Sequence, residues 1–319
     1  MPSRRPAAKP RRRPAPDRTA RTPPRAARRH RQIRAQFDPN PSGEWRRYGG
    51  EARRVLVREL RSRFLARHLP SGSGWVLELG PGPGRFTPQI LGSGGHVAAV
   101  DLSLPMLRSA RRRLRGRNGV DRVAWVRGAG ERLPFPDRSF RAAVLYGNIL
   151  GFSAHETSAL LAELGRVVAP NGRLLLDVAS PGGAIQEFFV RGAERRFLRR
   201  VLRSPDRYFV RRVLATGHQP YAPGRMANWE FGFHTAPEVG RMLARAGFRV
   251  LDRMAVGPIG AFQKAIARAA RREPTTWENL LRTEEMVGRR PGVLETGHGF
   301  VVAAVRDGRP RPAAGPRHR

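Results

Sequence analysis

Residues 76–86 read VLELGPGPGRF, a short apolar run that leads directly into a glycine-rich turn. A short apolar run that ends in glycine and proline predicts a buried strand. Glycine stands at every second position of the turn, at Gly80, Gly82 and Gly84, where the missing side chain lets backbone approach a ligand closely. A strand that ends in such a turn predicts a nucleotide-type cofactor site.

The spacing of the glycines helps to distinguish between cofactors. A dinucleotide-binding turn carries the pattern G-x-G-x-x-G, whereas the residue after the third glycine here is Arg85. Glu78, two residues before the first glycine, would repel phosphates and can accept hydrogen bonds from an ammonium group. The turn therefore favours a cationic cofactor that carries an amino acid over NAD.

A second predicted strand, residues 96–100, leads into Asp101. In a doubly wound fold, a carboxylate about 20 residues after the glycine turn binds the ribose hydroxyls. The separation between Gly80 and Asp101 fits one strand-helix-strand step, so Asp101 is the predicted ribose ligand.

Four motifs in order along the chain resemble those of class I S-adenosylmethionine-dependent methyltransferases. They are E-x-G-x-G-x-G at residues 78–84, a strand ending in VDLS at 100–103, GAGERLPFPDRSF at 128–140 and RVVAPNGRLLL at 166–176. The resemblance implies a Rossmann-like α/β fold, in which a doubly wound seven-stranded sheet has an antiparallel last strand and helices on both faces. It also implies S-adenosylmethionine as the cofactor and methyl transfer as the reaction.

The hydrophobic pattern predicts the elements of this sheet. Strands are expected at residues 75–79, 96–100, 123–126, 141–146, 173–179, 248–256 and 300–306. Helices are expected at residues 86–91, 105–115, 155–168 and 237–246. Gly172, after Asn171, is expected to end the third of these helices.

The two ends of the chain differ from its centre in composition. Residues 1–35 carry 13 Lys or Arg side chains against one Asp and have almost no large apolar side chains, which predicts a disordered basic tail. Residues 307–319 are predicted to be a second, shorter basic tail. The methyltransferase domain would span residues 36–306, with insertions at 181–234 and 257–298 that surround the cleft and bind the substrate.

The formal net charge of +36 leaves two interpretations of the long tail open. A basic arm can bind the phosphates of a nucleic acid. Only Lys9 and Lys264 are lysines among 61 basic residues, however, and a GC-rich genome produces such an arginine bias without selection for binding. The tail is then a nonfunctional extension or the product of a start codon placed too far upstream.

Several classes of site and location are excluded or disfavoured by composition. The chain has no cysteine, which excludes disulfides, zinc sites built on Cys and a thiolate nucleophile. No cluster of Asp and Asn has the spacing of a metal site, so no metal is expected. No apolar stretch is long enough to span a membrane, and the expected location is cytoplasmic.

The resemblance assigns a role to each residue of the cofactor site. Glu78 would bind the methionyl ammonium group directly or through water, while the three glycines would let backbone pass the methionine chain. Asp101 would hold the ribose hydroxyls, and Leu102 and Met106 would lie against adenine.

Position 129 departs from the family pattern. Many relatives carry an acid there that accepts a hydrogen bond from the adenine amino group, whereas this chain has Ala129. Either Glu131 or the backbone of Ala129 and Gly130 is predicted to take its place.

Residues 146–152, which read YGNILGF, follow the fourth strand and in this family line the acceptor side of the cleft. They lack the [D/N]-P-P-[Y/F] sequence of enzymes that methylate exocyclic base amines. Gly147-Asn148 is similar to the G-N-S segment of small-molecule enzymes of the glycine N-methyltransferase type. Asn148 is therefore the predicted acceptor-orienting residue.

A general base can be supplied by several residues. His155 stands near the start of a predicted helix after the acceptor loop and is the first candidate. Tyr146, His218 and His234 are the alternatives.

Three functions follow from these patterns. The leading hypothesis is a methyltransferase that acts on an O, N or C atom of a small molecule. The second is an RNA- or protein-directed methyltransferase that uses the basic tail for affinity, and the third is a noncatalytic nucleic-acid-binding protein with the same fold. The oligomeric state stays open.

Overall fold

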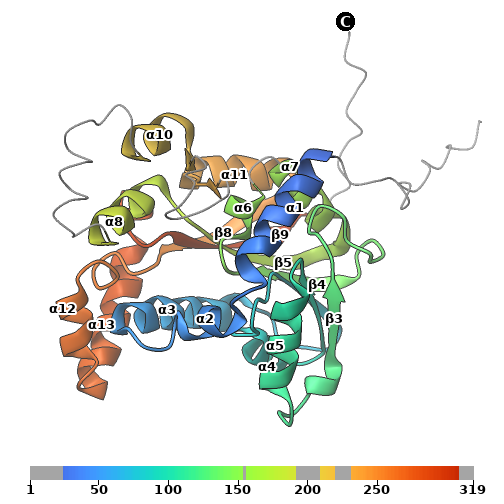
Figure 1. The fold of residues 1–319 in the computed structure, drawn as a ribbon, viewed down its shortest axis with the longest axis horizontal. Helices are drawn as coiled ribbons and strands as arrows, with labels where there is room; N and C mark the ends of the chain where they lie inside the picture. The colour runs from blue at the N-terminus through green and yellow to red at the C-terminus, as the bar shows by residue number, and fades with distance from the viewer. Residues whose placement is uncertain (1–23, 154–155, 192–208, 220–230, 309–319) are drawn as a thin grey trace, which may run out of the picture.

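The computed structural model describes residues 24–153, 156–191, 209–219 and 231–308. Seven strands form one sheet in the order β3-β2-β1-β4-β5-β9-β8 (Figure 1). The strands of the sheet are β1 Trp75–Leu79, β2 His96–Asp101, β3 Val123–Arg127, β4 Phe140–Leu145, β5 Val168–Val178, β8 Phe248–Ala255 and β9 Phe300–Arg306. A separate ribbon pairs β6 His218–Gln219 with β7 Phe231–Gly232.

Strand directions divide the sheet into two parts. β1 pairs in parallel with β2 and β4, and the outer neighbours β3 and β5 continue this parallel arrangement. β9 runs antiparallel to both β5 and β8. The prediction of a doubly wound seven-stranded sheet with an antiparallel last strand is confirmed.

Helices cover both faces of the sheet (Figure 1). They are α1 Pro24–Phe37, α2 Pro41–Arg46, α3 Ala52–His68, α4 Thr87–Gly92, α5 Leu104–Leu114, α6 Ile149–Phe152, α7 Thr157–Val167, α8 Pro181–Arg191, α10 Phe209–Thr216, α11 Ala236–Arg245, α12 Lys264–Ala270 and α13 Pro274–Gly288. A short 3₁₀ turn, η1 Val120–Arg122, precedes β3.

Two hydrophobic cores lie on opposite faces because successive strand residues point to opposite sides. Val76 and Val144 join one core with side chains of α3, α4 and α13. Leu77 and Leu145 join the other core with side chains of α7 and α11. Within the described ranges, no helix is both long and apolar enough to cross a bilayer.

The predicted role of Gly172 at the end of the helix before β5 is wrong. α7 ends at Val167 and β5 begins at the next residue, so Gly172 lies inside the strand rather than after a helix. Asn171 has a left-handed φ of 63°, and the register of β5 against β4 shifts at this place. The Asn-Gly pair therefore forms a bulge within β5, since this pair tolerates left-handed backbone in either setting.

The predicted disorder of residues 24–35 is also wrong, because these residues belong to α1. Ala26, Arg29 and His30 are all buried against the rest of the domain. Two of these three are polar, so a count of large apolar side chains underestimated the contacts that order the segment. The remainder of the two predicted tails, residues 1–23 and 309–319, lies outside the described residues.

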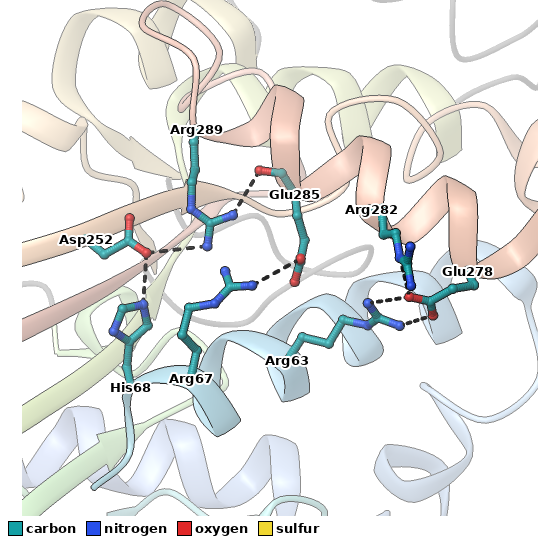
Figure 2. A network of polar contacts seen from close by, with 8 residues as sticks. All are labelled: Arg63, Arg67, His68, Asp252, Glu278, Arg282, Glu285 and Arg289. Atoms are coloured by element: carbon teal, nitrogen blue, oxygen red, sulfur yellow. Dashed lines mark hydrogen bonds and ion pairs between the residues drawn. The ribbon is translucent and has the colours of Figure 1, made fainter.

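The second insertion packs against α3 through a polar network (Figure 2). Arg63 of α3 forms an ion pair with Glu278 of α13. One turn further along α3, Arg67 lies 3.3 Å from Glu285. His68 lies 2.8 Å from Asp252 of β8. The insertion thus holds α3 in position.

Gly84 is expected to tolerate no side chain. It has a φ of +82°, and a Cβ there would lie 2.9 Å from the Cβ of Ala110 in α5. Gly84→Ala should lower the free energy of unfolding by about 2 kcal/mol or more, because it adds backbone strain to a clash. Thermal and urea denaturation measure this. Gly92→Ala is the control, since Gly92 has no atom within 4 Å of its Cβ position, and equal losses in the two variants would contradict the packing role.

Candidate functional site

A cavity of about 580 Å³ lies at the carboxyl ends of β1, β2, β4 and β5. The glycine turn and the residues that follow β2, β4 and β5 form its floor, while α1, α2, α3 and α8 contribute the opposite wall. Ligands of doubly wound sheets bind at this edge. The volume lies within the range of small-molecule sites, roughly 300–1,000 Å³.

The three glycines of the turn serve different purposes, and all have positive φ. A Cβ at Gly80 would lie 2.3 Å from Ile149, and one at Gly84 would meet α5, so both glycines allow close packing. Gly82 has no atom within 4 Å of its Cβ position and lines the cavity. Gly82 is therefore where backbone is open to a ligand.

Asp101 lies at the end of β2 and lines the cavity, as predicted. One carboxylate oxygen accepts a hydrogen bond from Gly82 N at 3.0 Å, and the other accepts from Ser103 N at 2.8 Å. Burial raises the pKa of Asp101 to about 6, although these two N–H groups act in the opposite direction. Leu102 and Met106 also line the cavity and supply apolar surface beside the carboxylate.

Glu78 lies behind the glycine turn and does not reach the cavity wall. Its side chain is buried, and its Oε2 has no hydrogen-bond partner among the described residues. Burial, together with the nearby charge of Asp101, raises the pKa of Glu78 to about 7, although the side chain of Thr87 acts in the opposite direction. Contact with a ligand ammonium group stays a prediction.

The segment predicted to contact adenine reaches the cavity in part. Gly130 and Glu131 line it, whereas Ala129 does not and instead bridges to Arg132. Glu131 Oε1 lies 2.9 Å from His30 Nε2 of α1. Burial alone would raise the pKa of Glu131, but the bond to His30 holds it below its ordinary value. The acid predicted to replace the missing one at position 129 is thus already paired.

Helix α1 closes one side of the cavity. Arg29 donates to the carbonyl of Gly151 at 3.1 Å and to that of Phe152. Phe37 packs edge-on against Phe152, with ring centroids 5.3 Å apart. The sequence offered one signal of this contact. Ile33 and Phe37, two apolar residues among arginines, are four positions apart, as on one face of a helix.

Loss of the His30–Glu131 contact is expected to loosen α1. His30→Ala should increase amide hydrogen exchange in α1 and speed the dissociation of S-adenosylhomocysteine by roughly threefold to tenfold, because one part-buried hydrogen bond contributes about 1 kcal/mol. Stopped-flow chase experiments measure the second effect. Arg31→Ala, an exposed change in the same helix, is the control, and identical rates in both variants would contradict a closing role for α1.

Asn148 follows β4 and lines the cavity, and its position is tightly fixed. It has a left-handed φ of 58°, its Oδ1 accepts from Ala179 N at 2.9 Å, and its N donates to Asp177 Oδ1 at 2.7 Å. The side chain lines the cavity, and its Nδ2 has no hydrogen-bond partner among the described residues. Its role in orienting an acceptor stays a prediction.

The candidate general bases differ in their position relative to the cavity. His155 lies outside the described residues. Tyr146 lines the cavity, but burial raises the pKa of its phenol above the ordinary value, and its hydroxyl donates to the carbonyl of Arg61 at 3.4 Å. His218 and His234 are not part of the cavity wall. The described part of the chain therefore brings only Tyr146 of this group to the cavity, in a form unsuited to act as a base.

His298 lines the cavity but was missed by sequence reasoning. It belongs to the second insertion, and no motif distinguishes it from other surface histidines. Burial, followed by the charge of Arg61, lowers the pKa of His298 to about 3. The imidazole is therefore neutral at physiological pH.

The two insertions contribute unequally to the cavity wall, and the binding of substrate by each of them stays a prediction. From residues 181–234, Gly183, Ala184, Glu187, Phe231 and Phe233 line the cavity. From residues 257–298, His298 does so among the described residues. The second insertion mainly supports α3.

Fold and site together define the class of ligand that the cavity can bind. A doubly wound sheet of this strand order, a glycine turn after β1 and a carboxylate at the end of β2 form a nucleoside-binding site. The residues fit S-adenosylmethionine, because the open side of Gly82 leaves room for its amino-acid chain, Asp101 can accept from two hydroxyls and Met106 offers an apolar surface to adenine.

Comparison with known proteins agrees with this fit. Residues 76–172 match the model of a family described as a methyltransferase domain. This part of the chain is a class I S-adenosylmethionine-dependent methyltransferase domain, as its motifs predicted.

Curated relatives match this part of the chain. A ubiquinone/menaquinone biosynthesis C-methyltransferase of Pectobacterium carotovorum is 32% identical over 104 residues, which cover 32% of this chain and 41% of the relative. A demethylmenaquinone methyltransferase of Corynebacterium kroppenstedtii is 38% identical over 99 residues, or 31% and 39% of the two chains. The matched region thus spans about two fifths of each relative.

Solved structures share the fold over more of the chain. A complex between the Haloferax volcanii Trm112 methyltransferase activator and a methyltransferase gives a TM-score of 0.55 at 16% identity, over 88% of this chain and 99% of the other. An S-adenosylmethionine-dependent methyltransferase of Listeria monocytogenes gives 0.52 at 16% identity, over 79% and 99%. At these identities the likeness concerns the fold alone.

Proposed function

We propose that the protein transfers the methyl group of S-adenosylmethionine to an O, N or C atom of a small molecule. The observation that carries this proposal is the cavity itself, which joins the glycine turn and Asp101 to a space lined by α1, α3 and α8. A cavity of about 580 Å³ has the size of small-molecule sites. The quinone-methylating activity named for the curated relatives supports a small-molecule acceptor.

The side chains of this protein would contribute positioning and exclusion of water. S-adenosylmethionine supplies, when bound, a methyl carbon on a sulfonium that an acceptor displaces in line. Asp101 holds hydroxyl groups at the floor, and Asn148 presents an amide beside the acceptor space. Helix α1 covers the cavity and limits access of water. Such positioning can account for much of a rate enhancement without a dedicated base.

The basic tail supports the competing nucleic-acid hypotheses less than its composition alone suggests. Arg29 and His30 of the tail bond to the cavity rim, which gives this part of the segment a role in the domain itself. Binding of RNA, modification of protein and the cytoplasmic location stay predictions.

Two measurements test the proposal. Titration calorimetry should detect S-adenosylhomocysteine binding at micromolar concentrations, and methyl-labelled S-adenosylmethionine should transfer label to the small-molecule fraction of a cell extract. Label that enters only RNA or protein would replace the proposal with the second hypothesis. Absence of cofactor binding would contradict enzyme function altogether.

A further inference from the structure

Three arginines converge on one tyrosine in the wall of the cavity. The guanidinium carbons of Arg47, Arg61 and Arg85 lie 5.7, 5.9 and 5.5 Å from the ring centroid of Tyr48. All four residues line the cavity. We call them the arginine cluster.

The positive charge of the cluster is only partly neutralised. Arg61 is buried and lies 2.6 Å from Asp177 Oδ2, and Arg47 at the rim lies 3.3 Å from Glu44. Arg85 donates to the carbonyl of Trp45 and stacks over its ring at 4.5 Å. Within the part of the chain that the structure describes, Arg85 forms no ion pair.

The positive charge shifts the pKa values of groups within the cluster. Burial alone would raise the pKa of Tyr48, yet Arg47 and Arg61 hold it below its ordinary value. Burial and then Arg58 lower the pKa of Arg85, although an arginine stays protonated at any physiological pH. A cavity with walls of low dielectric strengthens such a charge.

Another part of the wall is apolar and aromatic. Phe152 packs edge-on against Phe231 with ring centroids 4.9 Å apart, and Phe231 packs against Phe233 at 5.1 Å. All three phenylalanines line the cavity. The cavity therefore combines a cationic region with an aromatic one.

We propose that the methyl acceptor is an acidic small molecule whose carboxylate or phosphate lies against Arg61 and Arg85 and whose apolar body lies against Phe231 and Phe233. Arginine is the side chain best suited to this contact, since its planar donors match both anions. The inference rests on the proposed function and adds the charge of the substrate to it. It also gives an anionic partner to Arg85.

The test begins by dividing a small-molecule cell extract into anions and unbound compounds on an anion exchanger at about pH 8. Full-length protein and methyl-labelled S-adenosylmethionine are then added to each fraction. We expect label transfer with the anionic fraction. Transfer confined to the unbound fraction overturns the inference and leaves the proposed function standing, whereas transfer with neither fraction overturns both.

Variants identify the residues involved. Arg85→Gln should lower kcat/KM for the active fraction by about tenfold, the equivalent of one lost charged contact, and Arg85→Lys should lose less. Arg111→Gln, an exposed change on α5, is the matched control and should match the wild type. Equal activity of Arg85→Gln and the control would contradict the inference.

A second arm distinguishes the acceptor from the cofactor as the source of the anion. S-adenosylhomocysteine carries a carboxylate, and 5′-methylthioadenosine lacks it. We expect Arg85→Gln to bind both compounds within about threefold of the wild type, below the tenfold step of a lost charged contact. If this variant binds S-adenosylhomocysteine at least tenfold more weakly and methylthioadenosine unchanged, Arg85 serves the cofactor and the inference is wrong.

Discussion

Asp101→Ala is expected to raise the dissociation constant of S-adenosylhomocysteine by on the order of 100-fold, as titration calorimetry would measure. The carboxylate lines the cavity floor and is the predicted acceptor for two ligand hydroxyls. Hydrogen bonds to a charged group contribute about 1.5–3 kcal/mol each, and every 1.4 kcal/mol changes affinity tenfold. The substitution also leaves Gly82 N without the acceptor that holds the glycine turn.

The control for this experiment is Asp121→Ala, which removes an exposed acid from the turn before β3. Its affinity should equal that of the wild type. Circular dichroism of both variants establishes that they are folded. A loss of less than about threefold in Asp101→Ala, far below the 1.5–3 kcal/mol of a charged hydrogen bond, would show that Asp101 does not bind the ligand.

Glu78→Gln is expected to stabilise the ligand-free protein increasingly as pH rises. The carboxyl titrates at its ordinary value of 4.5 when unfolded and at about 7 when folded. Between these values the folded state binds more protons, so wild-type stability falls as pH rises through this window. Glutamine does not titrate. The variant should therefore gain about 2.5 kcal/mol relative to the wild type between about pH 5 and pH 8.

Urea denaturation at several pH values measures this difference. Asp307→Asn provides a control, because Asp307 is exposed and its replacement removes no charge from the interior. The comparison of variant with wild type cancels the opposite contribution of His298, whose lowered pKa destabilises the folded state as pH falls. A stability difference that is constant across the range would contradict a buried, titrating Glu78.

The cofactor side of the cavity was predictable because residues close to one another in the sequence form it. The glycine turn and Asp101 are one strand-helix-strand unit, and the spacing within that unit limits where each residue can lie. The alternation of strands and helices in the parallel part of the sheet follows from the same repeated unit. The bulge at Asn171 was not predictable in this way, because an Asn-Gly pair is equally suited to a helix end and to a bulge.

The closing side of the cavity depends on contacts between distant segments. Arg29 bonds to Gly151, Arg61 pairs with Asp177, and His298 lines the same cavity from a distant part of the chain. No local spacing links these residues. Composition even predicted disorder for part of α1, since it does not register the hydrogen bonds that bury Arg29 and His30.

The position of β9 has a consequence for the order of events on the ribosome. β8 precedes β9 in the chain, but it pairs with the sheet only through β9. During synthesis, β5 and β8 therefore each present an unpaired edge until α12, α13 and β9 have been translated. Unpaired edges invite association with other chains. A nascent protein of this topology is therefore expected to be prone to aggregation during that interval.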